Sequence, residues 1–103
     1  MDPGQTIAST YLSKLGWARE WRRNLNRELY PAARREDLEE KERQVDRLEE
    51  EAEAYFSTEY EILRKQDTPE AKQALRSILN MLGHRTDLGF IGKRIVDRIR
   101  RTS

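Results

Sequence analysis

The chain has 103 residues, of which 36% are hydrophobic and 38% are charged, and its formal net charge is +1. A chain of this length forms at most one hydrophobic core, so we expect a single helical domain over residues 1–103. It contains no cysteine, which excludes disulfides, thiol nucleophiles and thiolate metal sites. The first residues do not have the pattern of a signal peptide, and no apolar run approaches the ~20 residues that span a bilayer. We therefore expect a cytoplasmic protein without a membrane span.

The charged residues are separated along the chain into three blocks. Residues 1–35 hold seven Lys and Arg against three acids, residues 36–61 hold three against twelve, and residues 62–103 hold ten against four. Fifteen of the twenty basic residues are Arg, whose planar guanidinium group binds phosphate and carboxylate groups bidentately. This distribution predicts basic surfaces at both ends of the sequence, with an acidic surface between them.

Residues 6–30 are predicted to form a first helix, because apolar residues recur there every three or four positions. This apolar stripe consists of Ile7, Tyr11, Leu15, Ala18, Trp21, Leu25 and Leu29. On a different side, Arg19, Arg23 and Arg27 recur at every fourth position and form an arginine ladder. Proline disfavours helix at the residue before it, so Tyr30-Pro31 predicts the turn that follows.

Residues 33–66 contain no Gly or Pro and are rich in Glu, Arg, Leu and Ala, which predicts one long helix. Its apolar residues follow a short, imperfect coiled-coil pattern, in which Lys41 and Glu59 occupy seam positions. The apolar members are Leu38, Val45, Leu48, Ala52, Tyr55, Phe56, Tyr60, Ile62 and Leu63.

Two shorter helices are expected after this long one. Thr68 is a good N-cap and Pro69 suits the first helical position, so the third helix is expected over residues 69–82. Gly83 is expected to end it in the left-handed conformation. A fourth helix over residues 87–101, capped by Thr86 or Asp87, would turn its apolar residues inward. These are Leu88, Ile91, Ile95, Val96 and Ile99.

The predicted fold class is all-α: an antiparallel helical hairpin with a long central helix, plus two short C-terminal helices. Two helices cannot enclose a core, so we expect the hairpin to be covered by the C-terminal helices, by a second copy, or by both. A dimeric helical bundle, and hence a homodimer, is the arrangement that we favour. The segment 69–101 also has the outline of a helix-turn-helix, although a plain helical hairpin has the same outline more often.

Two groups of basic residues are candidate nucleic-acid-binding residues, because Arg at helical spacing can follow a phosphate backbone. They are Arg19, Arg23, Arg27, Arg34 and Arg35 in the first group, and Lys93, Arg94, Arg98, Arg100 and Arg101 in the second. The first group has an alternative role, which is pairing with carboxylates of the long helix. The second group has only Asp97 beside it, and Phe90 on the same side could stack on a base.

The sequence predicts a non-enzymatic protein that binds RNA or DNA duplexes largely without sequence preference. The alternative is a protein–protein interaction module that docks through the acidic long helix or through Trp17 and Trp21. These tryptophans are expected to serve as core or dimer contacts, or otherwise as membrane-interface anchors. His84 is the only histidine, and no phosphate-binding loop or paired-carboxylate motif is present. We therefore expect no catalytic site, no metal site and no cofactor.

Overall fold

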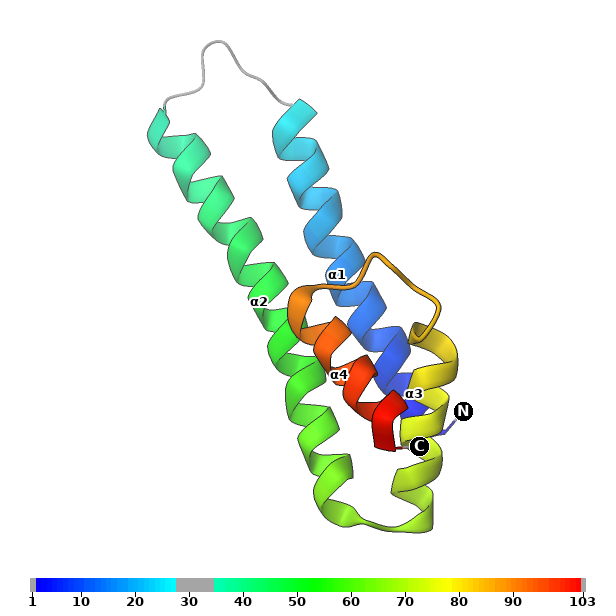
Figure 1. Ribbon diagram of the computed structural model, residues 1–103. Coiled ribbons are helices and arrows are strands. Elements are labelled where there is room, and N and C mark those ends of the chain that lie inside the picture. Colours follow the sequence, from blue (N-terminus) through cyan, green and yellow to red (C-terminus); the bar gives the residue numbers. More distant parts are fainter. Residues whose placement is uncertain (1, 28–34, 103) are drawn as a thin grey trace.

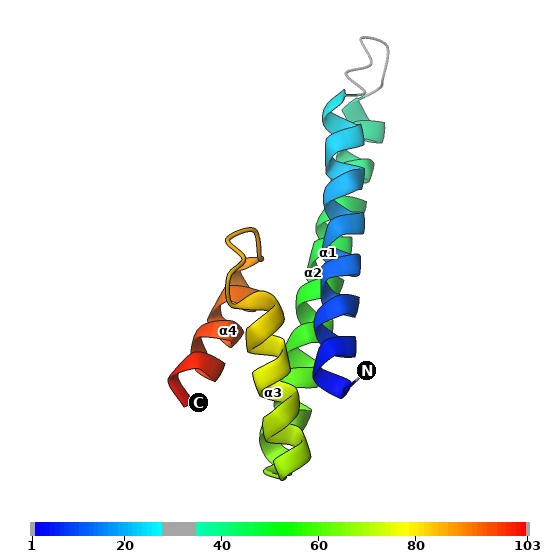
Figure 2. The same cartoon turned by 90° about the vertical axis from the view of Figure 1, so that its right-hand side faces the viewer.

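The computed structural model describes residues 2–27 and 35–102, and all its regular elements there are helices. They are α1 (Pro3–Arg27), α2 (Arg35–Gln66), α3 (Pro69–Leu82) and α4 (Phe90–Thr102). The predicted all-α class is confirmed. Helices α1 and α2 lie side by side and run in opposite directions, while α3 and α4 pack near the beginning of α1 and the end of α2 (Figures 1 and 2). The structure measures 56 × 24 × 23 Å, so the other half of the α1–α2 pair extends as an arm.

Helix α1 begins at Pro3, three residues before the predicted start, because Asp2 caps it. The Asp2 carboxylate accepts a hydrogen bond from the Gln5 backbone N–H at 3.0 Å, and the Gln5 side chain accepts one from the Asp2 N–H at 3.3 Å. The other Asp2 oxygen accepts a hydrogen bond of 2.6 Å from the Ser77 hydroxyl of α3. That bond, more than the cap itself, lowers the pKa of the Asp2 carboxyl. Asp2 therefore both starts α1 and ties it to α3.

The start of α3 agrees with the prediction, whereas its end does not. The Thr68 hydroxyl accepts a hydrogen bond from the Ala71 N–H at 3.0 Å, and Pro69 occupies the first turn. Gly83 has φ −64° and ψ −21°, which is a right-handed conformation, so the prediction of a left-handed residue is wrong. The physical reason is that the helix end is capped by a side chain. Arg100 of α4 donates a hydrogen bond of 2.8 Å to the Gly83 carbonyl, so this end does not depend on a left-handed turn.

Helix α4 begins at Phe90, not at residue 87 as expected from a Thr86 or Asp87 cap. The Asp87 carboxylate is bound by Arg85 at 2.8 and 3.0 Å instead, and Arg19 lies 3.6 Å from it. The Arg85 hydrogen bonds hold the pKa of the Asp87 carboxyl below its ordinary value. An ion pair within the loop has therefore taken the side chain that was expected to cap the helix.

The core lies where all four helices meet, and the Tyr11 and Phe56 rings stack at its centre with centroids 4.5 Å apart. Most residues predicted to face inward are buried or packed against this core. The exceptions on described residues are of two kinds. Leu25, Leu38 and Leu48 are half-buried outside this core, and Trp21, Ile62 and Ile91 expose 39%, 45% and 41% of their surface. Leu29 lies outside the described residues. The buried seam of α2 follows Val45, Ala52, Phe56, Tyr60 and Leu63, which leaves Ile62 on the outer side of the helix.

Candidate nucleic-acid interface

The exposed side of α4 carries four basic residues and one aromatic ring. We call Phe90, Lys93, Arg94, Arg98 and Arg101 the basic face of α4. All five are exposed, whereas Gly92, Ile95, Val96 and Ile99 are buried on the opposite side of the helix. Phe90 exposes 75% of its surface, the largest fraction among the exposed large hydrophobic residues of the described chain. The helix therefore separates the residues that fix it in the fold from those that it presents to solvent.

The positive charges of this face are not neutralised by neighbouring carboxylates. Within residues 2–27 and 35–102, Lys93, Arg94, Arg98 and Arg101 form no ion pair. The Arg94 guanidinium lies 5.7 Å from the centroid of the Phe90 ring, which is a cation–π distance. An aromatic ring next to unpaired guanidinium groups can stack on a base while the arginines contact phosphates.

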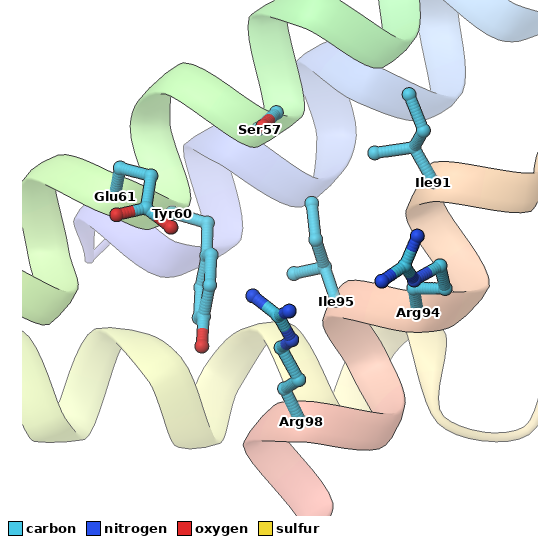
Figure 3. A pocket seen from close by; sticks show the side chains of 7 residues that line it. All are labelled: Ser57, Tyr60, Glu61, Ile91, Arg94, Ile95 and Arg98. Atoms are coloured by element: carbon cyan, nitrogen blue, oxygen red, sulfur yellow. The ribbon is translucent and has the colours of Figure 1, made fainter.

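Arg94 and Arg98 also line a hollow of about 200 Å³ between α2 and α4. Figure 3 shows both side chains rising from α4, with Ser57, Tyr60 and Glu61 across from them on α2. The two arginines are four residues apart, so their guanidinium groups follow one another along one side of the helix. A hollow of this size, with two guanidinium groups on its rim, has room for one phosphate group.

The one carboxylate in the hollow has its own partner. Arg64 donates hydrogen bonds of 2.9 and 3.3 Å to Glu61 and is the main reason why the pKa of the Glu61 carboxyl is lowered. Lys65 and Arg98 make smaller electrostatic contributions in the same direction. Because Arg64 already holds Glu61, this carboxylate does not occupy Arg94 or Arg98.

A hydrogen-bonded group beneath α4 fixes the orientation of the basic face. The Tyr11 hydroxyl donates to Glu53 at 2.6 Å and accepts from the Gly89 N–H at 3.3 Å, and the Gly92 N–H donates to the other Glu53 oxygen at 2.7 Å. The carboxylate thus satisfies an N–H in the first turn of α4, where a negative charge also complements the helix dipole. This Tyr11–Glu53 anchor joins α1, α2 and α4.

Glycine is required at both ends of the Tyr11–Glu53 anchor, because the side chains approach the backbone too closely for a Cβ atom. A Cβ on Gly89 would overlap the Glu53 carboxylate, and one on Gly92 would overlap the Tyr11 hydroxyl. The backbone of Gly89 and Gly92 therefore holds the start of α4 against α1 and α2. Phe90, which lies between these two glycines, is left on the outer side of the helix.

The anchor predicts a dependence of stability on alkaline pH. Burial, followed by the hydrogen bond to Glu53 and its negative charge, raises the pKa of the Tyr11 hydroxyl above its ordinary value of 10.0. The folded state thus keeps Tyr11 neutral where the unfolded state ionises it, so this contribution is complete below pH ~10 and is lost above it. Between pH ~10 and pH ~11, the unfolding free energy of the unaltered protein should fall by about 1 kcal/mol more than that of Tyr11→Phe, which has no hydroxyl to ionise. Urea unfolding of both proteins at the two pH values measures this, and equal declines would contradict it.

The structure places Arg100 differently from the rest of its predicted group. Its guanidinium donates a hydrogen bond to the Gly83 carbonyl at 2.8 Å and another to Asp97 at 3.3 Å. Arg100 therefore joins the end of α3 to α4, and its contacts are within the fold.

The arginine ladder of α1 is divided among different partners. Arg19 lies 3.6 Å from Asp87, and Arg23 lies 3.2 Å from Glu20. Among the described residues, the ion pairs between α1 and the carboxylates of α2 come from Arg22, which binds Asp46 and Glu49 at 2.9 Å each. These two hydrogen bonds raise the pKa of the Arg22 guanidinium, Glu49 being the larger cause. The side chains of Arg27 and Arg35, and the whole of Arg34, lie outside the described residues.

Sequence reasoning did not identify Arg22, although a signal was present. Arg22 falls on the same side of α1 as Tyr11, Leu15 and Ala18, so a helical projection places it at the contact with α2. A long basic side chain in an apolar stripe, opposite an acidic helix, predicts an ion pair between the helices.

An acidic groove borders the basic face of α4 at its N-terminal end. It has a volume of about 740 Å³, and its apolar lining residues are Leu15, Ala54, Phe90 and Ile91. Its carboxylates are Asp46, Glu49, Glu50 and Glu53, against Arg19 and Arg22. A polyanion would be repelled from this groove, so the phosphate contacts are expected at Lys93, Arg94, Arg98 and Arg101, none of which lines it.

No family model, curated protein or solved structure was found to match this chain. Within the described ranges, no helix combines the length and apolar character needed to cross a membrane. The same ranges hold no group of three or more His, Asp and Glu side chains placed to bind a metal ion.

Proposed function

We propose that this chain is a non-enzymatic nucleic-acid-binding protein that works as a homodimer and contacts duplex phosphates through the basic face of α4. The observation that carries this proposal is the set of four cations on that face that form no ion pair with a described residue, two of which line a hollow with room for a phosphate group. Contacts from guanidinium and ammonium groups to phosphates read no base sequence, so the binding is largely sequence-independent. Arg19 and Arg23 contribute less, because each already has a carboxylate within 4 Å.

Binding by this surface should depend steeply on salt. For the four phosphate contacts of one basic face, counterion release lowers the binding constant about a hundredfold between about 50 mM and about 200 mM salt. A short fluorescent RNA duplex and the DNA duplex of the same sequence, titrated by anisotropy at both salt concentrations, measure the slope. Binding that is undetectable for both duplexes at the lower salt concentration overturns the proposal.

The charge reversal Arg94→Glu with Arg98→Glu tests the site itself. We expect it to weaken binding at least tenfold and to reduce the salt slope by about 2, since two phosphate contacts are lost. The matched control is Arg43→Glu with Arg47→Glu, which has the same charge change and spacing on exposed positions of α2. Circular dichroism should show intact helices in both variants. An equal loss of binding in the control would mean that net charge, and not this face, determines affinity.

A second candidate function is a protein interaction module, and the acidic groove favours it. Phe90 and Ile91 beside Asp46, Glu49 and Glu50 suit a basic partner protein with apolar side chains. Failure to bind either duplex, together with capture of a basic peptide that Glu50→Lys abolishes, would replace the first proposal by this one.

A further inference from the structure

A second exposed apolar surface lies on the arm, away from α4. We call Trp17, Trp21, Asn24 and Leu25, together with the neighbouring Lys41 and the buried Val45 beneath them, the tryptophan face. Trp17 exposes 59% of its surface and Trp21 exposes 39%, and their rings meet edge to face with centroids 6.2 Å apart. Large aromatic side chains contribute most of the binding energy of protein interfaces when they become buried, so this exposure needs an explanation.

A hollow of about 340 Å³ lies directly beside Trp21, lined by Trp21, Asn24, Leu25, Lys41 and Val45. Lys41 is the one charged residue among these five, in a chain of which 38% is charged. A hollow whose lining carries a single charge offers little for a polyanion or for a strongly charged protein to recognise. Its chemistry fits an apolar, aromatic occupant.

Within the described residues, α3 and α4 do not extend along the arm (Figure 2). The continuous core reaches Leu15 on α1 and Ala52 on α2, and α3 and α4 cover only the region around it. Beyond these residues, Ala18 and Val45 are buried, whereas Trp17 and Trp21 are exposed within the described part of the chain. Two paired helices bury only one side of each, and helical bundles complete their core with further helices.

We infer that the tryptophan face is the dimer interface, and that its occupant is the same face of a second copy. Trp17 and Trp21 are one helical turn apart, so a two-fold axis between antiparallel α1 helices brings Trp17 of each copy to the hollow beside Trp21 of the other. The hollow exceeds one tryptophan side chain in volume. A ring and a hollow on the same patch make the face self-complementary, as an interface between identical copies requires. This inference rests on the proposed homodimer and is independent of the nucleic-acid contact.

The oligomeric state tests the interface. We expect sedimentation equilibrium to give twice the 12.3 kDa chain mass for the unaltered protein and the monomer mass for Trp17→Ser. Phe90→Ser is the matched control, because it removes another exposed ring, from α4, and should leave the dimer intact. A monomeric unaltered protein overturns the inference, as does a Trp17→Ser variant that remains dimeric.

Tryptophan fluorescence provides a second measurement that needs no variant. The chain has two tryptophans and both lie on this face, so their emission reports on it alone. Dilution through the dissociation range should shift the emission to longer wavelength as water reaches both rings, whereas an unchanged spectrum across a dimer-to-monomer transition would place the interface elsewhere. If the dimer dissociates at the tryptophan face while duplex binding is absent, the nucleic-acid proposal fails and this inference stands.

Discussion

Replacing Glu53 by alanine is expected to lower the free energy of unfolding by about 3 kcal/mol, an unusually large effect for a residue that is only half-buried. The carboxylate accepts hydrogen bonds from the Tyr11 hydroxyl at 2.6 Å and from the Gly92 N–H at 2.7 Å. Alanine leaves both donors without this acceptor, next to a Tyr11 side chain that is fully buried. Urea unfolding followed by circular dichroism measures the change.

Glu50→Ala is the matched control for this experiment. Glu50 lies on the same helix three residues earlier, is exposed, and makes no hydrogen bond or ion pair in the described structure. We expect its removal to change the unfolding free energy by less than about 0.5 kcal/mol. A loss at Glu50 that matches the loss at Glu53 would show that the charge of α2, and not the Tyr11–Glu53 anchor, supports stability.

The effect on nucleic-acid binding separates the role of Glu53 from that of the basic face. Glu53 does not face phosphate in the proposed complex, but it holds the first turn of α4 and thereby the direction of Arg94 and Arg98. Glu53→Ala should therefore weaken duplex binding without changing the salt slope, because the number of phosphate contacts is unchanged where the helix is in place. A reduced slope would mean that α4 has detached.

The helices were predictable from the sequence wherever local signals agree with the fold. In α3, Thr68 is the N-cap and Pro69 lies in the first turn, as their residue types predict. The apolar residues of α3 also recur with the spacing of its buried side. Asp2 and Pro3 carry the same signal at the beginning of α1, and Gln5 completes it, but the prediction began at the apolar stripe instead. The start of α1 was therefore within reach of the rules that found α3.

The start of α4 and the end of α3 depend on residues that are distant in sequence, and no local rule finds them. Gly92 receives its acceptor from Glu53, which lies 39 positions away, and the Gly83 carbonyl receives its donor from Arg100. Local reading assigned these roles to Asp87 and to a left-handed Gly83. In both cases a side chain from another helix provides the cap, and the fold must exist before the partner is known.

The candidate site divides in the same way. The composition of α4 and the outward position of Phe90 follow from helical periodicity, so its basic face could be predicted. Which arginines keep their charge unpaired could not, because this depends on the carboxylates that other elements bring close. Arg100 is engaged by the end of α3, while Arg98 lies opposite a glutamate that Arg64 already holds. The sequence shows which basic side chains α4 carries, and tertiary contacts decide which of them stay free of intramolecular partners.

A methyl group at Gly92 should have the opposite effect to a methyl group at Gly16, although both glycines lie within helices. Alanine is favoured over glycine in a helix by about 1 kcal/mol, and a Cβ on Gly16 meets nothing within 4 Å, so Gly16→Ala should stabilise the protein by about that amount. At Gly92 the new Cβ would overlap the Tyr11 hydroxyl. The Tyr11 ring cannot move aside easily, because it stacks on Phe56 and is hydrogen-bonded to Glu53.

We therefore expect Gly92→Ala to destabilise the protein by about 2 kcal/mol, since overpacking and a lost hydrogen bond exceed the gain in helix propensity. The difference between the two variants, about 3 kcal/mol in urea unfolding, isolates the contact because the substitution is identical. Tyr11→Phe in the Gly92→Ala background removes the overlapping hydroxyl and should recover part of the loss, which a purely local effect on α4 would not allow. Recovery of duplex binding in the same double variant would connect the packing beneath α4 to the orientation of its basic face.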